Sequence, residues 1–362
     1  MSTTKISNPQ GSQNALTRSD IWFKDGNIVL ISESFIFKIH SGQLERHSEI
    51  FAGMFDIPQP PEQDLIDGCP SIKMLDNPDD LYYFLSALYD GLHFASPRPL
   101  HFARLAAVLR LSTKYFVPHL RQQCLERLKL DWPIDLEGWD AREAEATTIK
   151  GAYNPRQYTA HPILVIELAI ELGLNEILPS AFYDLSRYGP SKIMYGTVGI
   201  KSILFSPDEE SRIVCLSKQL LVRTLRGRET AQQFLVDFLS AQLENRDPSP
   251  KCWHPQSSHS FKAHPCVQAF EQMYLDIYRC IGGVAIGRDA DPLFTLAQGM
   301  DRLVRPDKVE GERARALMCG PCKSLFFTDC TKGREAAWVL LPTWFGFAGG
   351  WGKDSGDKEL QS

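Results

Sequence analysis

The sequence predicts an α+β protein, with a small sheet flanked by helices near the N-terminus and a mostly α-helical C-terminal region. Three observations carry this prediction. Two strand-like runs at 27–31 and 35–40 are separated by a short polar break at 32–34. An amphipathic stretch at 43–55 follows directly and favours a helix. From residue 133 onward the spacing of apolar residues favours helices only.

Length and composition limit the classes of function. A chain of 362 residues has room for two or three domains, and 43% hydrophobic with 23% charged residues is ordinary for a globular protein. The formal net charge of -5 argues against direct nucleic-acid binding. The N-terminus has no apolar signal core, and no apolar run approaches the ~18 residues that a membrane span needs. With an odd count of nine cysteines, these features favour a cytoplasmic and/or nuclear location without membrane contact.

The N-terminal elements follow from local signals. Residues 1–17 are mostly small and polar, so we expect a disordered tail, with structure beginning near Ser19. After the two strands and the helix at 43–55, a proline-rich loop leads to a short strand at 71–75. The next helix, at 78–90, has the clearest end signals, with Asn77 as N-cap, Pro78 in the first position and Gly91 after the end. Two further helices are predicted at 100–115 and 118–130.

The second half is predicted to be helical throughout. The pattern favours helices at 162–172 and 175–188, broken by Gly173. The start signal at 206–209 precedes a helical pattern through Leu220, and another helix is predicted at 230–243. After a linker at 245–250, three more are expected at 266–282, 292–303 and 319–341; the segment 135–150 is ambiguous. The expected organisation is a tail at 1–17, a domain at 18–132, a helical region at 133–245, a helical cysteine-containing module at 246–347 and a flexible tail at 348–362.

The order of elements over 19–130, with His40 after the second strand and Ser48 and Phe51 on the following helix, resembles a BTB/POZ domain. The motif at 25–27, the Trp132-Pro133 boundary and the C-terminal segments at 319–322 and 337–346 are similar to the large fungal BTB family. The resemblance implies a non-enzymatic adaptor that binds proteins and can form homodimers. It also implies either a cullin-type ubiquitin ligase or transcriptional proteins as partners, and the sequence does not choose between them.

A Cys-x-x-Cys motif, Cys319-Gly320-Pro321-Cys322, has two interpretations. A thiol-disulfide oxidoreductase would use Cys319 as a thiol of lowered pKa at a helix N-terminus, with Cys322 as its partner. Such enzymes place the motif after a buried strand, usually behind a tryptophan, whereas the helix-prone run at 313–318 precedes it here. The redox interpretation is therefore the weaker one.

The second interpretation is a structural zinc site. Cys252 and Cys266 lie upstream, with His254, His259 and His264 between them. Four thiolates, or three with one histidine, would complete a tetrahedral zinc site. Zinc–sulfur bonds of about 2.3 Å would place the four sulfurs roughly 3.7 Å apart. The alternative is a set of buried free thiols in a small core, and the sequence leaves both open.

Other residues with chemical potential favour ordinary structural roles. His40 is expected to form local hydrogen bonds, since the motif places no nucleophile beside it. Four aromatic residues are expected in the core and not on a partner-binding stripe: Phe35, Phe37, Phe51 and Phe55. The basic cluster at 223–228 favours a solvated helix end over a localisation signal, and Cys124 and Cys215 favour core positions within amphipathic helices.

Overall fold

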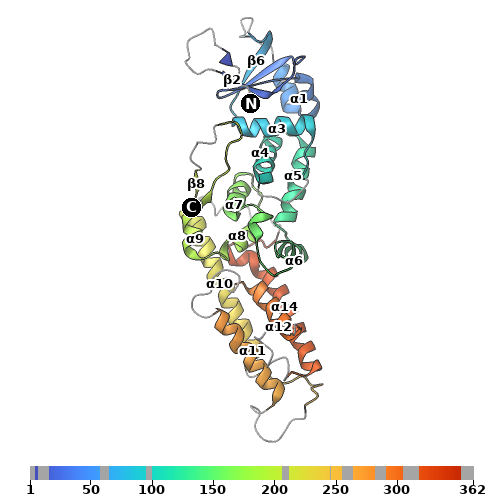
Figure 1. The fold of residues 1–362 in the computed structure, drawn as a ribbon, viewed down its shortest axis with the longest axis vertical. Helices are drawn as coiled ribbons and strands as arrows, with labels where there is room; N and C mark the ends of the chain where they lie inside the picture. Colours follow the sequence, from blue (N-terminus) through green and yellow to red (C-terminus); the bar gives the residue numbers. More distant parts are fainter. Residues whose placement is uncertain are drawn as a thin grey trace. The chain divides into compact units, whose positions relative to one another are not determined.

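The protein divides into two compact units, each built from segments that are not contiguous in the sequence. The computed structural model describes residues 5–6, 16–57, 65–94, 100–205, 212–244, 246–254, 264–281, 291–304 and 318–351. The first unit comprises Met1–Asp131, Ala141–His161 and Val198–Ile213; the second comprises Trp132–Asp140, Pro162–Thr197 and Val214–Ser362. A small sheet at the N-terminus precedes a mostly helical chain, which confirms the predicted α+β class (Figure 1).

A mixed sheet forms the N-terminal part of the first unit, with strand order β1-β2-β4-β3-β6-β5. Its strands are β1 (Lys5–Ile6), β2 (Leu16–Trp22), β3 (Ile28–Ser32), β4 (Phe35–Ile39), β5 (Leu65–Ile66) and β6 (Cys69–Met74). The antiparallel β3–β4 hairpin lies at the centre, with β2 and β6 parallel to its two strands. The predicted hairpin and the strand near 71–75 are confirmed. Strand β2 begins at Leu16, ahead of the start expected near Ser19, while 1–4 and 7–15 lie outside the described residues.

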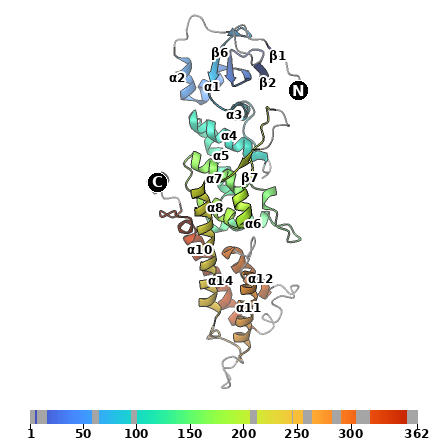
Figure 2. The ribbon, with the colours of Figure 1, turned by 90° about the vertical axis from the view of Figure 1, so that its left-hand side faces the viewer.

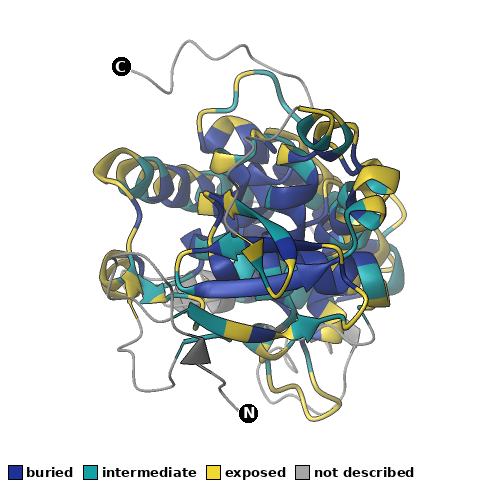
Figure 3. Ribbon diagram, turned by 90° about the horizontal axis from the view of Figure 1, so that it is seen from above, coloured by how far each residue is buried: buried dark blue, intermediate teal, exposed yellow. Residues whose placement is uncertain are grey.

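The central hairpin is buried on both faces. Every residue of β4 is buried, and Ile31 is the one partly exposed residue of β3. On one face Val29 and Ile36 pack with Cys69. Figure 3 shows the central strands in the colour of buried residues. A strand covered on both faces needs a continuous apolar run, which explains the sequence of this hairpin. Phe35, Phe37 and Phe51 are likewise buried, so their assignment to the core is confirmed. Phe55 is only partly buried, so its predicted core position is wrong.

The single helix predicted at 43–55 is wrong: two helices, α1 (Ser41–His47) and α2 (Glu49–Phe55), meet at Ser48. Ser48 has an extended backbone, with φ −144° and ψ 116°, which ends α1. Its hydroxyl accepts a hydrogen bond from the Phe51 backbone N–H (3.2 Å) and donates one to the Tyr115 carbonyl (2.5 Å). A serine that caps the next helix in this way favours the break over a continuous helix.

The remaining helices of the N-terminal part agree with their local signals. They are α3 (Pro78–Asp90), α4 (Leu100–Lys114) and α5 (Pro118–Asp131). The Asn77 side chain accepts from the backbone N–H groups of Asp79 (2.9 Å) and Asp80 (3.3 Å), and Gly91 follows with φ 79°. The predicted cap and end of this helix are confirmed, and the ambiguous segment 135–150 contains α6 (Leu136–Glu145) before a short 3-10 turn (Pro155–Gln157).

The second unit is mostly helical. Its helices are α7 (Pro162–Glu171), α8 (Leu178–Ser186), α9 (Pro190–Tyr195), α10 (Lys218–Leu243), α11 (Pro265–Ile281), α12 (Pro292–Val304) and α14 (Gly320–Trp344). Helix α11 packs along α10, and α12 packs mainly along α14, as Figures 1 and 2 show. Gly173, with φ 66°, separates α7 from α8 as predicted. Among the described helices, none is both long and apolar enough to cross a membrane.

Two expectations for the second half are wrong. The helical pattern through Leu220 begins instead with a strand, β8 (Ile213–Val214), which pairs with β7 (Thr197–Val198); the start signal at 206–209 lies outside the described residues. Helix α10 begins after Ser217, whose hydroxyl accepts from the Leu220 N–H (3.4 Å), and continues unbroken through Leu243. The predictions that a helix ends within 220–230 and that the second half contains helices only are therefore wrong.

Buried charges join α8 to α12. Asp291, at the start of α12, accepts hydrogen bonds from the Tyr183 hydroxyl, from Arg187 Nη1 (3.1 Å) and from the Phe294 N–H (3.0 Å). Arg187 also pairs with Asp184 at 2.5 Å, and both carboxylates are 1% exposed. Because a buried carboxylate needs compensating partners, these residues fix the position of α12 against α8.

Gly227 explains how α10 passes its partner closely without a break. A Cβ atom at this position would overlap the ring of Phe345, which directly follows α14. A Cβ at Gly333 of α14 would likewise lie 2.5 Å from Cε2 of Phe238 on α10. The two helices therefore approach each other closely at two points, and at each point a glycine packs against an aromatic ring of the other helix or of the residue that follows it.

We expect Gly227→Ala to destabilise the second unit, although alanine is the better helix former. Overpacking against Phe345 should lower the free energy of unfolding by about 1–3 kcal/mol. Gly53→Ala in α2 is the matched control, because nothing lies within 4 Å of its added Cβ; helix propensity alone should then raise the free energy of unfolding by about 0.5–1 kcal/mol. Calorimetry, with hydrogen exchange to assign each transition, measures both, and equal effects of the two substitutions would contradict the packing argument.

Candidate metal centre

The side chains of four cysteines, from three separate segments of the second unit, converge on one point. Cys252 lies in the loop after α10, and Cys266 lies in the first turn of α11. Cys319 is the N-cap residue of α14, and Cys322 lies in the first turn of that helix. The Cys-x-x-Cys motif turns two sulfurs toward one point because its residues occupy the start of a helix. The loop and α11 supply the other two.

The four sulfurs have the spacing of a tetrahedral site. Their ligand atoms all lie within 4.8 Å of one another. Cys252 Sγ is 3.7 Å from Cys266 Sγ and 3.5 Å from Cys319 Sγ. Tetrahedral bonds of about 2.3 Å require sulfur separations of roughly 3.7 Å. The predicted convergence of these four cysteines is confirmed, and His264 is not a member of the group; His259 lies outside the described residues.

Backbone N–H groups point at each of the four sulfurs. The pairs with measured separations are His254 N to Cys252 Sγ (3.4 Å), Cys319 N to Cys266 Sγ (3.4 Å) and Ser249 N to Cys322 Sγ (3.3 Å). The sulfur of Cys319 takes backbone hydrogen bonds from Trp253 and Cys322. A sulfur atom accepts hydrogen bonds best as a thiolate, so this set of donors favours anionic sulfur.

The pKa values of the thiols diverge within the cluster. Burial opposes ionisation of Cys319, but backbone donors from Trp253 and Cys322 outweigh it and lower its pKa to about 7. Burial raises the pKa of Cys322 to about 11 and raises that of Cys266 as well. Protein groups alone therefore favour one thiolate, and four together need a cation to offset their charge.

The first turn of α14 is shaped around the motif. Gly320 lies under the ring of Trp253, where an added Cβ would be 2.9 Å from Cη2. Pro321 occupies an early helical position at which the missing N–H costs no hydrogen bond. Trp253 itself is 73% exposed, whereas Cys319 and Cys322 are 6% and 0% exposed. The motif thus combines close backbone packing with enclosed sulfur atoms.

The other cysteines described by the structure lie apart from this group. Cys124 is buried, as predicted, and burial raises its pKa to about 12. Cys330 is also buried, with a pKa raised to about 12 for the same reason. Cys215 is exposed, in the segment between β8 and α10, so its predicted place in a helix core is wrong. The side chain of Cys280 is outside the described part of the chain.

His40 has the local hydrogen bonds that were expected. The Tyr89 hydroxyl accepts a hydrogen bond from the His40 backbone N–H (3.0 Å) and lies 3.1 Å from Nδ1 of the same residue. Nε2 of His40 is 3.3 Å from an Asp25 carboxylate oxygen. These partners fix the junction between β4 and α1 and include no nucleophile.

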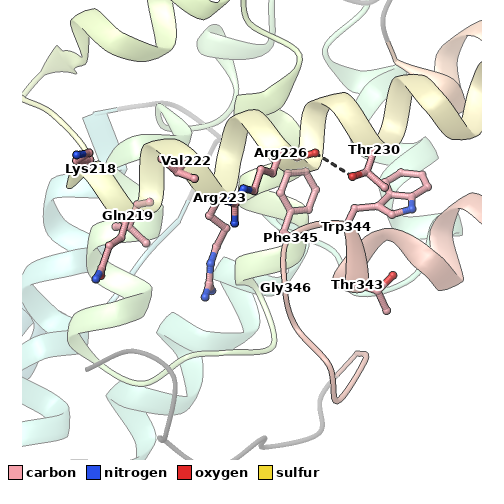
Figure 4. A pocket seen from close by; sticks show the side chains of 11 residues that line it. Lys218, Gln219, Val222, Arg223, Arg226, Thr230, Thr343, Trp344, Phe345 and Gly346 are labelled. Carbon is pink, nitrogen blue, oxygen red and sulfur yellow. Dashed lines mark hydrogen bonds between the residues drawn. The ribbon is translucent and has the colours of Figure 1, made fainter. Parts of the chain in front are cut away.

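The basic cluster at 223–228 does not form a helix end. It lies within α10, where Arg228 is buried and donates to the carbonyls of Ser186 and Tyr188. Arg223 and Arg226 instead line an open pocket of about 590 Å³ (Figure 4). The pocket walls also include Lys218 and the aromatic residues Trp344 and Phe345. The cluster therefore divides between a packing role and a cationic surface.

Sequence reasoning missed the features that depend on the backbone. The N–H groups aimed at sulfur follow from loop geometry, which carries no signal in residue types. The pocket beside α10 is formed where the chain returns after α14, and the sequence did not predict it, since the basic residues at 223–228 were interpreted as a helix end. Comparison with models of protein families, with curated proteins and with solved structures finds no match for this chain.

Proposed function

We propose that this chain is a non-enzymatic protein-interaction protein whose C-terminal helical unit is held together by one structural zinc ion. Cys252, Cys266, Cys319 and Cys322 are the proposed ligands. The observation that carries the proposal is the convergence of four sulfur atoms, from segments far apart in the sequence, within 4.8 Å of one another.

Three features favour a metal ion over four neutral core thiols. The sulfur spacing matches a single tetrahedral ion, whereas cysteines of an iron–sulfur cluster bind separate iron atoms and stand farther apart. Each sulfur accepts a backbone hydrogen bond, and Cys319 and Cys322 also lie at the positive end of a long helix. Four thiolates in tetrahedral geometry select zinc among the common divalent ions.

The donor set favours a structural role for the ion. Four protein ligands fill a tetrahedral coordination sphere, whereas catalytic zinc keeps one position for water or substrate. The alternative of thiol-disulfide exchange needs an accessible attacking sulfur. Cys319 and Cys322 are both buried, and two further sulfurs share their environment, which argues against that activity.

The interaction role is proposed for the first unit. After β2 its elements follow in the order β3-β4-α1-α2-β5-β6-α3-α4-α5. A hairpin, then helix, strand and helices is the order that the resemblance to BTB/POZ domains implies, and it supports the proposal. Because the central hairpin is buried, the contact surface that we propose is the turn between α4 and α5. There Phe116 is 68% exposed and has a left-handed φ of 51°, a conformation that costs free energy for a phenylalanine. Such an exposed aromatic ring suits contact with a protein partner, either a second copy, a cullin-type ligase or a transcriptional protein.

The purified chain should contain one equivalent of zinc. Cys319→Ser and Cys322→Ser should each lose it and destabilise the second unit, since structural zinc contributes directly to folding free energy. Cys215→Ser, which removes an exposed cysteine outside the group, should keep the full content. Elemental analysis by mass spectrometry measures the metal. Stoichiometric iron would replace zinc in the proposal, and metal-free wild-type protein would refute the site.

Zinc removal should expose thiols in a defined order. Before treatment, an alkylating reagent should modify Cys215 quickly and leave the four ligand cysteines protected. After chelation, the four should become reactive, because the ion no longer occupies their sulfur lone pairs. Peptide mapping by mass spectrometry distinguishes the sites. A redox pair would behave differently: Cys319 and Cys322 would form a reversible disulfide without any change of metal content.

Phe116→Asn should test the interaction surface without disturbing the fold. Asparagine accepts a left-handed backbone better than phenylalanine does, so stability should stay equal or rise slightly. Affinity purification with mass spectrometry should recover fewer copies of the specific partner than the wild-type chain does. Sedimentation at micromolar concentration tests self-association separately. A wild-type chain that is monomeric and captures no specific partner would remove the adaptor proposal.

A further inference from the structure

A histidine lies directly against the sulfur cluster without belonging to it. His264 immediately precedes α11 and is 6% exposed. Its Nε2 atom is 3.8 Å from Cys252 Sγ. The backbone N–H of Cys266 points at Nδ1 over 3.2 Å. Both ring nitrogens of this buried imidazole therefore have partners at the proposed metal centre.

The backbone contact determines which nitrogen carries the hydrogen. A backbone N–H can only donate, so Nδ1 must present its lone pair to Cys266 N. In a neutral imidazole one nitrogen accepts and the other donates, so the hydrogen resides on Nε2. The Nε2–H group then points at the sulfur of Cys252. The direction of the second contact follows: His264 donates and Cys252 accepts.

We propose that His264 is a positioning residue that donates a hydrogen bond to the metal-bound thiolate of Cys252. This inference rests on the metal centre proposed above. His264 is not itself a ligand, because four sulfurs complete the coordination sphere and its nitrogens are both engaged. Partners of this kind orient metal ligands and adjust their charge, and losing one typically costs about 10–100-fold in metal affinity.

The position of Cys252 explains the need for such a donor. Four thiolates around a divalent ion carry a net charge of about −2, which buried surroundings disfavour. Cys252 is the partly exposed member of the group, whereas Cys266, Cys319 and Cys322 are buried. It is also the proposed ligand that lies in a loop away from a helix, whereas the other three lie within the first turn of a helix or directly before it. A hydrogen bond from His264 withdraws charge from this sulfur and ties the loop to the start of α11.

The test compares two substitutions at position 264 in the full chain. His264→Leu removes the donor, whereas His264→Gln keeps an N–H group that can reach toward the same sulfur. His254→Gln serves as control, since the side chain of His254 stacks edge-on against His264 and only its backbone N–H contacts sulfur. Cobalt(II) replaces zinc as a spectroscopic probe, and competition with a chelator gives zinc affinity.

We expect His264→Leu to weaken zinc binding by about 10–100-fold and to move the sulfur-to-cobalt charge-transfer band to lower energy, because the undonated thiolate is richer in electrons. His264→Gln should lie between it and the wild type, and His254→Gln should match the wild type. The intensity of the cobalt ligand-field bands should stay that of a four-sulfur site throughout.

Three results would overturn the inference in different ways. If His264→Leu and His264→Gln both match the wild type in affinity and band energy, His264 has no effect on the bound thiolate although the metal centre exists. If His264→Leu instead gives the spectrum of a site that has lost a ligand, His264 is a ligand. A wild-type chain that binds neither ion removes the metal centre and this inference together. If His264→Leu fails to fold, the band position of His264→Gln decides.

Discussion

The carboxylate of Asp291 fixes the arrangement on which the helical unit depends. A buried carboxylate without partners is strongly unfavourable, so α12 can begin only where the Tyr183 hydroxyl and the Arg187 guanidinium are available. Both groups belong to the α8 segment, and burial with the neighbouring Asp291 charge raises the pKa of Tyr183 well above its ordinary value. Tyr183 therefore stays protonated and donates. Helix α12 in turn packs along α14, whose first turn carries Cys319 and Cys322.

Buried negative charge is compensated in different ways at Asp291 and at the cysteine group. At Asp291, side chains of opposite charge and a phenol compensate the buried anion. At the cysteines, the compensation comes from backbone N–H groups, and the remaining charge calls for a cation. The first solution is complete within the protein chain. The second needs the proposed metal ion, so the proposal implies that the stability of the cysteine end follows metal availability while that of the Asp291 end does not.

The sequence predicted features that depend on neighbouring residues and failed where distant contacts decide. Asn77, Pro78 and Gly91 sufficed to place α3, because caps act within one turn. The four cysteines could be grouped from the sequence because a tetrahedral zinc site needs four ligands and a Cys-x-x-Cys motif supplies only two of them. Ser48 was placed inside a helix because its partner, the carbonyl of Tyr115, is remote in sequence. The continuity of α10 through Gly227 depends on the ring of Phe345, and the role of Asp291 depends on α8; neither relation leaves a local pattern.

The interleaved order of the two units has a consequence for biosynthesis. The first unit takes its last segment, Val198–Ile213, after the chain has already begun the second. When the sheet and its helices have left the ribosome, the first unit still lacks a segment, so neither unit can yet complete its folding. The cysteine group is completed later still, because Cys322 follows α12 in the sequence and leaves the ribosome after it. The metal ion proposed above could therefore bind all four sulfurs only at a late step of maturation, after the other helices of the second unit have been synthesised.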